Sequence, residues 1–330
     1  MNELFLWAGI FIISLAVLIK SSDYFTNAAE KIGLWLGIPT FFIGVSIVAI
    51  GTSLPELISS IIAVHNGSSE IVIGNVLGSN IANIFLIVGV AGLIAKKQLE
   101  LSRNLLHVDL PFLVGTCFLL AIMIWDGVFT TGEGILLLIT LVMYSFYLIK
   151  SREKPEKEVR KQLRGVKGEL VDKTKKKKMK KGISLKTWFI LFGSIIGIYL
   201  GARFTVESVI TISQILEIGA EVIAVTAVAL GTSLPELMVT ISAAKKGKSE
   251  IAVGNVLGSN IFNILAVMGI PSMLGTLVIP PSMLTFSLPV MIMATLMFFF
   301  ITQNKEITRW EGGILIIFYA LFIAKIFNIF

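Results

Sequence analysis

The sequence has few charged residues, one cysteine and two histidines. Charged residues make up 15% of the 330 residues, whereas a soluble globular chain carries roughly 25%. Cys117 alone cannot form a disulfide within the chain or a thiolate metal cluster. His65 and His107 lie far apart without ligand spacing, so we interpret both as structural. Hydrophobic residues instead make up 55% of the chain, which indicates a membrane protein.

The net charge of +7 comes from one segment. Between Lys150 and Lys186 lie 16 of the 28 Lys and Arg residues, and the rest of the chain is slightly acidic. We therefore do not expect nucleic acid as a partner. Within this segment, Lys173–Lys181 is basic enough to bind anionic lipid head groups. The alternative is a solvated linker that sets the topology.

Long apolar segments dominate the remainder of the chain. A helix needs about 20 apolar residues to cross a bilayer. The sequence predicts ten such transmembrane helices, and with them an all-α integral membrane protein. The predicted spans are 4–26, 38–64, 70–95, 104–125, 130–150, 187–208, 219–244, 250–276, 281–302 and 309–329.

The basic residues predict the orientation of these spans. Lys and Arg mark cytoplasmic loops, and 26 of the 28 lie in the odd-numbered connections. We therefore expect both termini outside the cell, the Lys150–Lys186 loop in the cytoplasm and the chain in the plasma membrane. Glu3 and the absence of a basic residue before the first apolar run are not typical of a signal peptide. We interpret that run as the first span.

Two regions of the sequence are copies of one another. Residues 45–90 and 225–270 align at a constant offset of 180 without a gap, and 27 of 46 positions are identical. Both copies contain GTSLPEL and GNVLGSNI, which points to duplication and fusion. The copies are five predicted spans apart, so they should cross the membrane in opposite directions, as in many transporters. We divide the chain into a five-helix half at 1–150, with a repeat at about 44–90, a basic linker at 151–186, and a second half at 187–330, with a repeat at about 224–270.

Each copy places one acid well inside a predicted span. These acids are Glu56 and Glu236. A carboxylate at the bilayer centre costs ~2.5–3.5 kcal/mol on insertion scales. No Lys, Arg or His lies between 32 and 64 or between 204 and 244 to neutralise them. A cation from solution is the natural partner, and a polar contact between helices is the alternative.

A proline precedes each acid. Pro55 and Pro235 lack an N–H and clash with the carbonyl four residues back, which kinks a helix. Carbonyls freed inside a membrane must be satisfied, and here we expect them to line a cavity. Thr52 and Ser53 lie four and three residues before Glu56, so the three side chains share one helix face.

Polar residues also form a stripe on the following span of each copy. Asn75, Ser79 and Asn83 recur every fourth residue, and Asn255, Ser259 and Asn263 repeat them. Hydroxyl, amide and carboxylate oxygens suit Ca²⁺, which takes 6–8 oxygen ligands, and they suit Na⁺ as well. Two GxxxG patterns, Gly74 with Gly78 and Gly254 with Gly258, predict close helix packing that brings this stripe towards the acids.

These motifs resemble those of the prokaryotic sodium/calcium exchangers in the cation/calcium antiporter superfamily. The resemblance spans the whole chain, because GTSLPE occurs twice, each time followed by GNVLGSN. It implies that Glu56 and Glu236 are shared ligands of Ca²⁺ and Na⁺. It also implies further oxygen ligands, namely Thr52, Thr232, Ser53, Ser233, Ser79, Ser259 and Asn83, with backbone carbonyls at Ala49 and Ala229.

One position departs from part of this family. Some members, including potassium-dependent exchangers, have aspartate where this chain has Asn263. The missing charge argues against potassium cotransport. The Thr-Ser pair before Leu-Pro-Glu argues against the proton-coupled calcium exchangers, whose motifs tend to have Gly-Asn there.

The resemblance implies an electrogenic Na⁺/Ca²⁺ antiporter that works by alternating access with three Na⁺ per Ca²⁺. The first and sixth spans are candidates for the moving part. We expect no enzymatic activity and no cofactor; Na⁺ and Ca²⁺ are the transported ions and the lipid bilayer is the partner. A Ca²⁺/H⁺ antiporter on the same fold, a cation channel and an intramembrane hydrolase with two acids remain the alternatives.

Overall fold

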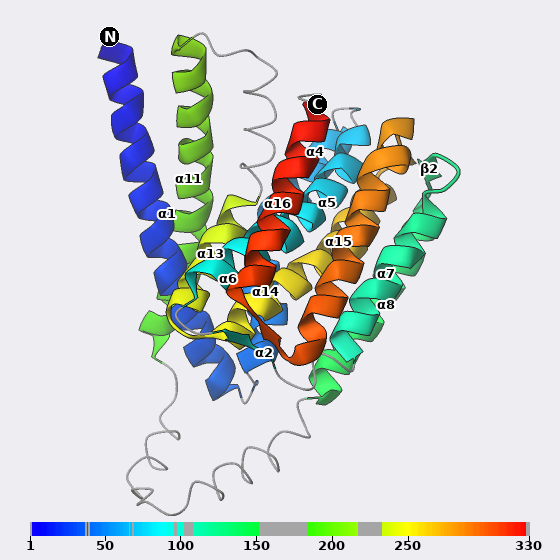
Figure 1. The fold of residues 1–330 in the computed structure, drawn as a ribbon, viewed down its shortest axis with the longest axis horizontal. Helices are drawn as coiled ribbons and strands as arrows, with labels where there is room; N and C mark the ends of the chain where they lie inside the picture. Colours follow the sequence, from blue (N-terminus) through cyan, green and yellow to red (C-terminus); the bar gives the residue numbers. More distant parts are fainter. Residues whose placement is uncertain are drawn as a thin grey trace, which may run out of the picture.

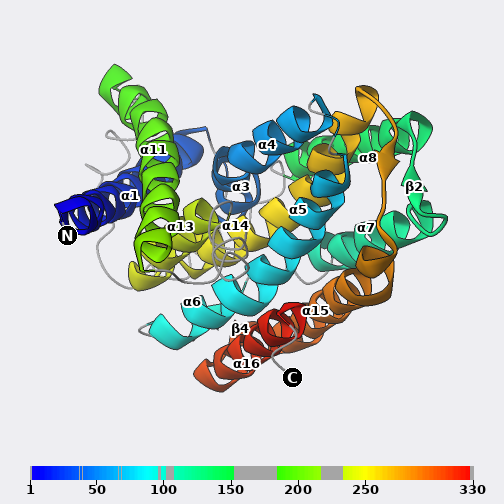
Figure 2. The same ribbon diagram turned by 90° about the horizontal axis from the view of Figure 1, so that it is seen from above.

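The computed structural model describes residues 2–151 and 184–327, except 37, 39, 66, 68, 96–97, 102–107 and 217–232. Nearly all of this part is helical (Figures 1 and 2). The predicted loop between Lys150 and Lys186 therefore lies almost entirely outside the described residues, and so does the candidate lipid-binding run Lys173–Lys181.

The helices overlap the predicted apolar segments, and the short strands lie between those segments. The first half contains α1 (Asn2–Trp35), α2 (Thr40–Ile43), η1 (Gly44–Val48), α3 (Ala49–Thr52), α4 (Leu54–His65), α5 (Glu70–Ile81), η2 (Ala82–Val88), α6 (Gly89–Ile94), β1 (Leu99–Glu100), α7 (Leu110–Met123), β2 (Val128–Phe129) and α8 (Thr131–Ser151). The second half contains α11 (Leu185–Ile215), α13 (Leu234–Lys245), α14 (Ser249–Phe262), η4 (Asn263–Val267), η5 (Pro271–Met273), β3 (Leu277–Val278), η6 (Met283–Ser287), α15 (Leu288–Ile301), η7 (Thr302–Asn304), β4 (Glu306–Ile307) and α16 (Arg309–Ile326).

Six helices in the described residues are long and apolar enough to cross a membrane, or seven if the bent pair Thr40–Thr52 and Leu54–His65 is one span. The six are Glu3–Trp35, Glu70–Ile94, Thr131–Lys150, Leu185–Thr205, Ser249–Met273 and Met283–Asn304. The predicted span 104–125 contains the shorter helix α7, and 309–329 contains α16. Much of 219–244 lies outside the described residues. Ten crossings therefore remain a prediction.

Two of the predicted helix ends were wrong. The first span was predicted to end at 26 and the sixth at 208, where polar residues begin. Helix α1 continues to Trp35 and α11 to Ile215. Near the end of α1, Asp23 and Glu30 form ion pairs with Lys246 and Lys248, which lie between α13 and α14. On α11, the hydroxyl of Ser208 donates to the Phe204 carbonyl one turn back (2.6 Å).

The all-α prediction omitted two short antiparallel strand pairs, which join the two halves of the chain. Strand β1 pairs with β4, with Leu99 opposite Ile307, and β2 pairs with β3, with Phe129 opposite Leu277. Adding 178 to the residue numbers of β1 gives those of β3, and subtracting 178 from those of β4 gives those of β2. The two strand pairs therefore have the same register. The repetition therefore extends beyond the two motifs.

The helices that follow β2 and β4 begin in the same way. Thr130 and Glu133 exchange hydrogen bonds at the start of α8, where the Thr130 N–H donates to Glu133 Oε2 (2.7 Å). Thr308 and Glu311 form the same capping box at the start of α16 (2.7 Å). A Thr-x-x-Glu sequence satisfies otherwise unpaired N–H groups at a helix start, which explains why both helices begin at these residues.

Helices α5 and α14 lie at the centre, while α1 and α11 stand side by side at one edge (Figures 1 and 2). In the most apolar stretch of Ser249–Met273, 94% of the residues are buried. In the corresponding stretch of Glu3–Trp35 the share is 11%. The labelled N- and C-termini lie at the same end of the molecule (Figure 1). The central helices carry the polar residues described next.

Candidate cation-binding site

Each acid lies just after the start of a helix, and in the first copy this start is a helix break. Helices α3 and α4 meet at Ser53 with a bend of 41°, as Pro55 predicts, because its nitrogen cannot donate to the Gly51 carbonyl. Ser53 has φ −89° and ψ 7°, and Ser233, at the start of α13, has φ −90° and ψ −2°. Helices α4 and α13 therefore begin directly after equivalent serines, and Glu56 and Glu236 lie in the first turn of these helices.

The two glutamates are buried and lie near each other. Each side chain is 1% exposed. The hydroxyl of Ser53, in the turn before Glu56, donates to Oε1 of Glu236 (2.8 Å). Among the described residues, Oε2 of neither glutamate has a hydrogen-bond partner, and no basic side chain forms an ion pair with them. Two buried carboxylates thus keep free lone pairs in a region without a compensating protein charge.

The first polar residue of each stripe braces the helix that carries its acid. Nδ2 of Asn75 donates to Ser60 Oγ (3.0 Å), and Nδ2 of Asn255 donates to Thr240 Oγ1 (2.9 Å). Nδ2 of Asn75 also donates to the Glu56 carbonyl (3.2 Å). These contacts repeat at an offset of 180 residues and hold the paired helices of each copy together.

Four further asparagines connect the two copies directly. Nδ2 of Asn83 donates to Asn260 Oδ1 (2.9 Å), and Nδ2 of Asn263 donates to Asn80 Oδ1 (3.2 Å). Among the described residues, Oδ1 of Asn83 and of Asn263 has no partner. Each amide nitrogen thus donates to the other copy, and each amide oxygen remains available as an acceptor.

A π-helical segment carries Asn83, and another begins at Asn263. The wider π turn is rare and occurs frequently at functional sites. A second feature also repeats, since the turns after α4 and α13 both place a glycine at positive φ, 77° at Gly67 and 69° at Gly247. Glycine adopts this conformation without a steric penalty, so the two helix hairpins turn in the same way.

The structure places several of the predicted site residues in contact with one another or with the polar stripes. Thr52 (1% exposed) donates to the Ala49 carbonyl and to Asn255 Oδ1, both at 3.2 Å. The hydroxyl of Ser79 donates to Asn75 Oδ1 (3.3 Å). Ser233 and Ser259 are buried, and Ser259 Oγ has no partner among the described residues. Thr232 and Ala229 lie outside the described residues.

Four contact residues were missing from the predicted set, namely Asn80, Asn260, Ser60 and Thr240. A signal for them existed in the sequence. Asn80 and Asn260 end the GNVLGSN motifs, and Ser60 and Thr240 follow the two acids by four residues in both copies. Polar residues at matching positions of two buried helices are expensive without partners, and this rule would have identified them.

The predicted close packing at GxxxG is confirmed in the second copy and was wrong for the first, where among the described residues a Cβ on Gly78 would meet nothing within 4 Å and one on Gly74 only Met283 Cε at 3.5 Å. A Cβ on Gly258 would lie 2.3 Å from the Val45 carbonyl oxygen, and one on Gly254 would lie 2.7 Å from the Phe41 carbonyl oxygen. Only glycine permits this approach of α14 to η1 and α2. The contact places Asn255 beside Thr52.

The potential ligands in this region are carboxylate, amide, hydroxyl and backbone oxygens. In the part of the chain that the structure describes, no group of three His, Cys, Asp or Glu residues could hold a metal ion. Hard oxygen donors with two carboxylates favour Ca²⁺ or several Na⁺ over a softer transition metal.

Comparisons with known proteins agree with this chemistry. The family model described as "Sodium/calcium exchanger protein" matches residues 6–150 and 186–327. The chain is 37% identical to Sodium/calcium exchanger MaX1 of Methanosarcina acetivorans, over 97% of this chain and 98% of that protein. It is 30% identical to inner membrane protein YrbG of Escherichia coli, over 93% and 92%. A solved structure of the sodium-calcium exchanger NCX_Mj superimposes with a TM-score of 0.80 at 29% identity, over 97% of this chain and 98% of that one.

Proposed function

Since this chain belongs to the sodium/calcium exchanger family, we propose that it is an electrogenic antiporter that exchanges three Na⁺ for one Ca²⁺ by alternating access, independently of K⁺. The observation that carries the proposal is the pair of buried glutamates. Each keeps one carboxylate oxygen without a hydrogen-bond partner among the described residues. Two repeat-related acids without a basic partner require a cation, and one Ca²⁺ matches their charge of −2.

The surrounding oxygens support a shared site for both ions. The amide oxygens of Asn83 and Asn263 and the hydroxyl of Ser259, which are buried and have no partner among the described residues, are the neutral ligands that we propose. Thr52, Ser53, Ser79 and the Ala49 carbonyl complete the ligand set in the first copy. Ser233, with Thr232 and Ala229, plays the equivalent part in the second. Because Ca²⁺ and Na⁺ use the same oxygens, occupancy by one excludes the other.

The repeated geometry supports an inverted arrangement of two five-helix halves with ten crossings. The asparagine contacts, the backbone conformation of Ser53 and Ser233, the positive-φ glycines and the strand pairs all recur at offsets of 178 or 180 residues. A site between two inverted halves can be opened alternately to each side of the membrane. With the protein in the plasma membrane and both termini outside, the turn between α13 and α14 faces the cytoplasm.

When three Na⁺ exchange for one Ca²⁺, one net positive charge crosses the membrane in the direction of the Na⁺. This charge is worth about 2.3 kcal/mol per 100 mV, so the membrane potential changes the direction and rate of exchange. Asn263 contributes no charge, and a K⁺ added to the cycle would be uncompensated in a region of low dielectric. The absence of a third acid at this position is the reason that we propose K⁺ independence.

The test is transport by the purified protein in sealed liposomes. Vesicles loaded with Na⁺ should accumulate ⁴⁵Ca²⁺ when diluted into Na⁺-free medium, and an inside-positive potential should accelerate the uptake. Vesicles without a Na⁺ gradient are the control. Uptake driven by a pH gradient alone would identify a proton antiporter. Downhill Ca²⁺ flux that does not respond to Na⁺ would identify a channel. Insensitivity to voltage would refute only the stoichiometry.

A further inference from the structure

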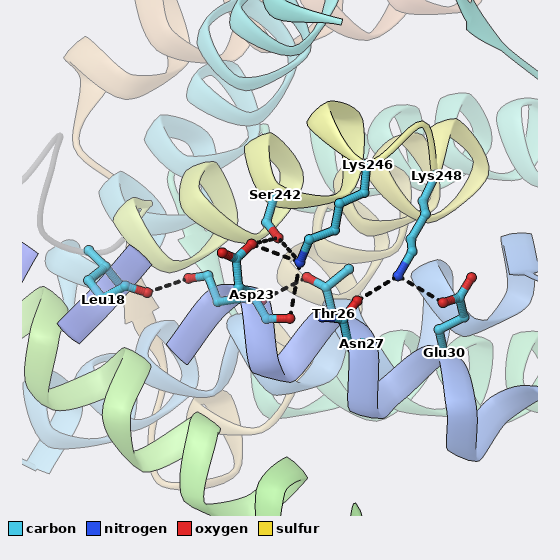
Figure 3. A network of polar contacts seen from close by, with 9 residues as sticks. Leu18, Asp23, Thr26, Asn27, Glu30, Ser242, Lys246 and Lys248 are labelled. Atoms are coloured by element: carbon cyan, nitrogen blue, oxygen red, sulfur yellow. Dashed lines mark hydrogen bonds and ion pairs between the residues drawn. The ribbon is translucent and has the colours of Figure 1, made fainter. Parts of the chain in front are cut away.

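Two lysines in the turn after α13 each hold an acidic residue of α1 (Figure 3). Nζ of Lys246 lies 2.7 Å from Oδ1 of Asp23, and the Ser242 hydroxyl donates to the same carboxylate (2.6 Å). Nζ of Lys248 lies 2.8 Å from Oε2 of Glu30. Both ion pairs are partly buried, with side-chain exposures between 18% and 38%.

Additional hydrogen bonds fix the geometry of both lysines. Nζ of Lys246 also donates to the Asp23 carbonyl (3.2 Å) and to Ser242 Oγ (3.0 Å). Nζ of Lys248 also donates to Asn27 Oδ1 (2.8 Å). Exposed pairs with a single contact contribute little, but a shared network loses less side-chain entropy for each contact formed. The ionic latch, defined as Asp23, Asn27, Glu30, Ser242, Lys246 and Lys248, therefore holds α1 against the α13–α14 turn.

The same stretch of α1 forms one wall of the candidate cation site. The buried side chain of Phe25 lies between the two ion-paired positions. A Cβ on Gly51 would lie 2.8 Å from Phe25 Cζ, so the ring packs directly on Gly51, the residue before Thr52. A displacement of α1 would move Phe25 off the helix break that carries the site. The latch is thus connected mechanically to the site.

The chain lacks the same latch in its other half. At the offset of 180, Lys246 and Lys248 correspond to Asn66 and Ser68, and Asp23 corresponds to Arg203. No lysine is available in the first copy to bind an acid on α11. In an antiporter with two related halves, the inward- and outward-facing states exchange the roles of those halves. A contact that only one half can form favours one of the two states when it is made in that state and broken in the other.

We propose that the ionic latch biases the exchanger towards the conformation in which α1 is docked on the α13–α14 turn, and that its release is a step in alternating access. This inference rests on the proposed function. A ligand binds with an apparent affinity proportional to the fraction of protein in the competent state. The latch therefore sets the ratio of the apparent Ca²⁺ affinities at the two faces of the membrane.

The test replaces both lysines by the residues of the other copy. In oriented proteoliposomes, Lys246→Asn with Lys248→Ser should change the ratio of the apparent Ca²⁺ affinities at the two faces by about three- to ten-fold, since each pair is worth up to about a five-fold change. Lys245→Asn is the matched control, because Lys245 is exposed in the same turn and forms no ion pair among the described residues. It should leave the ratio within two-fold. An unchanged ratio in the double variant would overturn the proposal.

A charge exchange separates the latch from general damage to the turn. Asp23→Lys alone should shift the ratio like the double variant, and Asp23→Lys with Lys246→Asp should restore it. Equal loss of activity in the single and exchanged variants would count against the latch, because it would indicate a structural defect.

A distance measurement keeps the latch testable without transport. Spin labels at positions 31 on α1 and 305 before α16, both exposed, can be introduced with Cys117→Ala. Double electron–electron resonance should show a second distance population in the double variant and none in the Lys245→Asn control. Identical distributions would refute the latch. If the unmodified protein failed to exchange Na⁺ for Ca²⁺, the proposed function would fail while this distance result stood by itself.

Discussion

The central helices α5 and α14 and the outer helices α1 and α11 are built differently. The most apolar stretches of Glu70–Ile94 and Ser249–Met273 are 72% and 94% buried, yet these helices carry five buried asparagines, Asn80, Asn83, Asn255, Asn260 and Asn263. The stretches on α1 and α11 are 11% and 28% buried. A polar network in the centre is stable only where every member is engaged or faces a ligand. This difference is the reason that we propose ion binding at the centre.

The outer helices hold to each other through small residues. A Cβ on Gly201 would lie 2.8 Å from the Leu18 nitrogen, and the hydroxyls of Thr205 and Ser14 are 3.0 Å apart. Close approach at small residues is a usual basis of helix association in membranes. This packing makes α1 and α11 a unit that can move together against the centre. We therefore propose that the central helices bind the ions and that the outer pair moves.

The largest expected effect comes from neutralising the central acids. Glu56→Gln and Glu236→Gln should each lower Na⁺-driven ⁴⁵Ca²⁺ uptake by more than about 100-fold, because an unpaired divalent charge inside the membrane is expensive. The shape of the amide is nearly the same, so the protein should still insert and elute as a single species in detergent. Uptake close to that of the unmodified protein in either variant would contradict the proposed site.

Next in size is the effect of removing an asparagine that orients a ligand. In Asn260→Leu the amide of Asn83 loses its acceptor and can rotate, and Asn80→Leu does the same to Asn263. We expect each variant to weaken the apparent Ca²⁺ affinity by about 5- to 100-fold, the range for an unmade buried hydrogen bond. Asn260→Asp and Asn80→Asp keep an acceptor oxygen and should lose less affinity than the leucine variants. A fall in maximal uptake without a change in affinity would argue for a purely structural role.

Alanine substitutions of glycine distinguish the centre from the outer pair. Gly258→Ala forces α14 away from Val45, and Gly201→Ala forces α11 away from Leu18. Overpacking costs typically 1–3 kcal/mol, so both should lower the melting temperature in detergent. Only Gly258→Ala should also weaken ion affinity. In Gly193→Ala the new methyl meets nothing within 4 Å among the described residues, so this control should be neutral or slightly stabilising.

The smallest effects should come from changes outside both regions. Shortening 155–180 to a flexible spacer should leave the Na⁺ and Ca²⁺ affinities within a few-fold, because every proposed ligand lies elsewhere. Loss of flux in a correctly inserted deletion would make the loop part of the machinery.

Potassium provides a prediction of no effect. Replacing K⁺ by choline on both sides of the membrane should leave Ca²⁺ uptake unchanged at a fixed Na⁺ gradient and clamped voltage. The reason is that Asn263 supplies no charge to compensate a K⁺ in the cycle. An obligatory K⁺ requirement would contradict the proposal.

The sequence alone determined the family, the helical class, the repeats and the acids at the helix breaks. These features depend on local rules. Apolar length predicts membrane helices, proline before an acid predicts a kink, and two copies of a motif predict two equivalent positions. Ten crossings and the ligand roles stay predictions, and Thr232 and Ala229 lie outside the described residues.

Only the tertiary structure decided which residues of one copy meet which residues of the other. Asn83 contacts Asn260, and Asn263 contacts Asn80, although nothing in the spacing of one helix specifies its neighbour. The C-terminal end of α1 and the ionic latch could not be predicted from the sequence either, because Asp23 and Glu30 are polar residues near the end of an apolar run. In the folded protein they pair with lysines more than 200 positions away in the sequence, and such a contact exists only after the chain has folded.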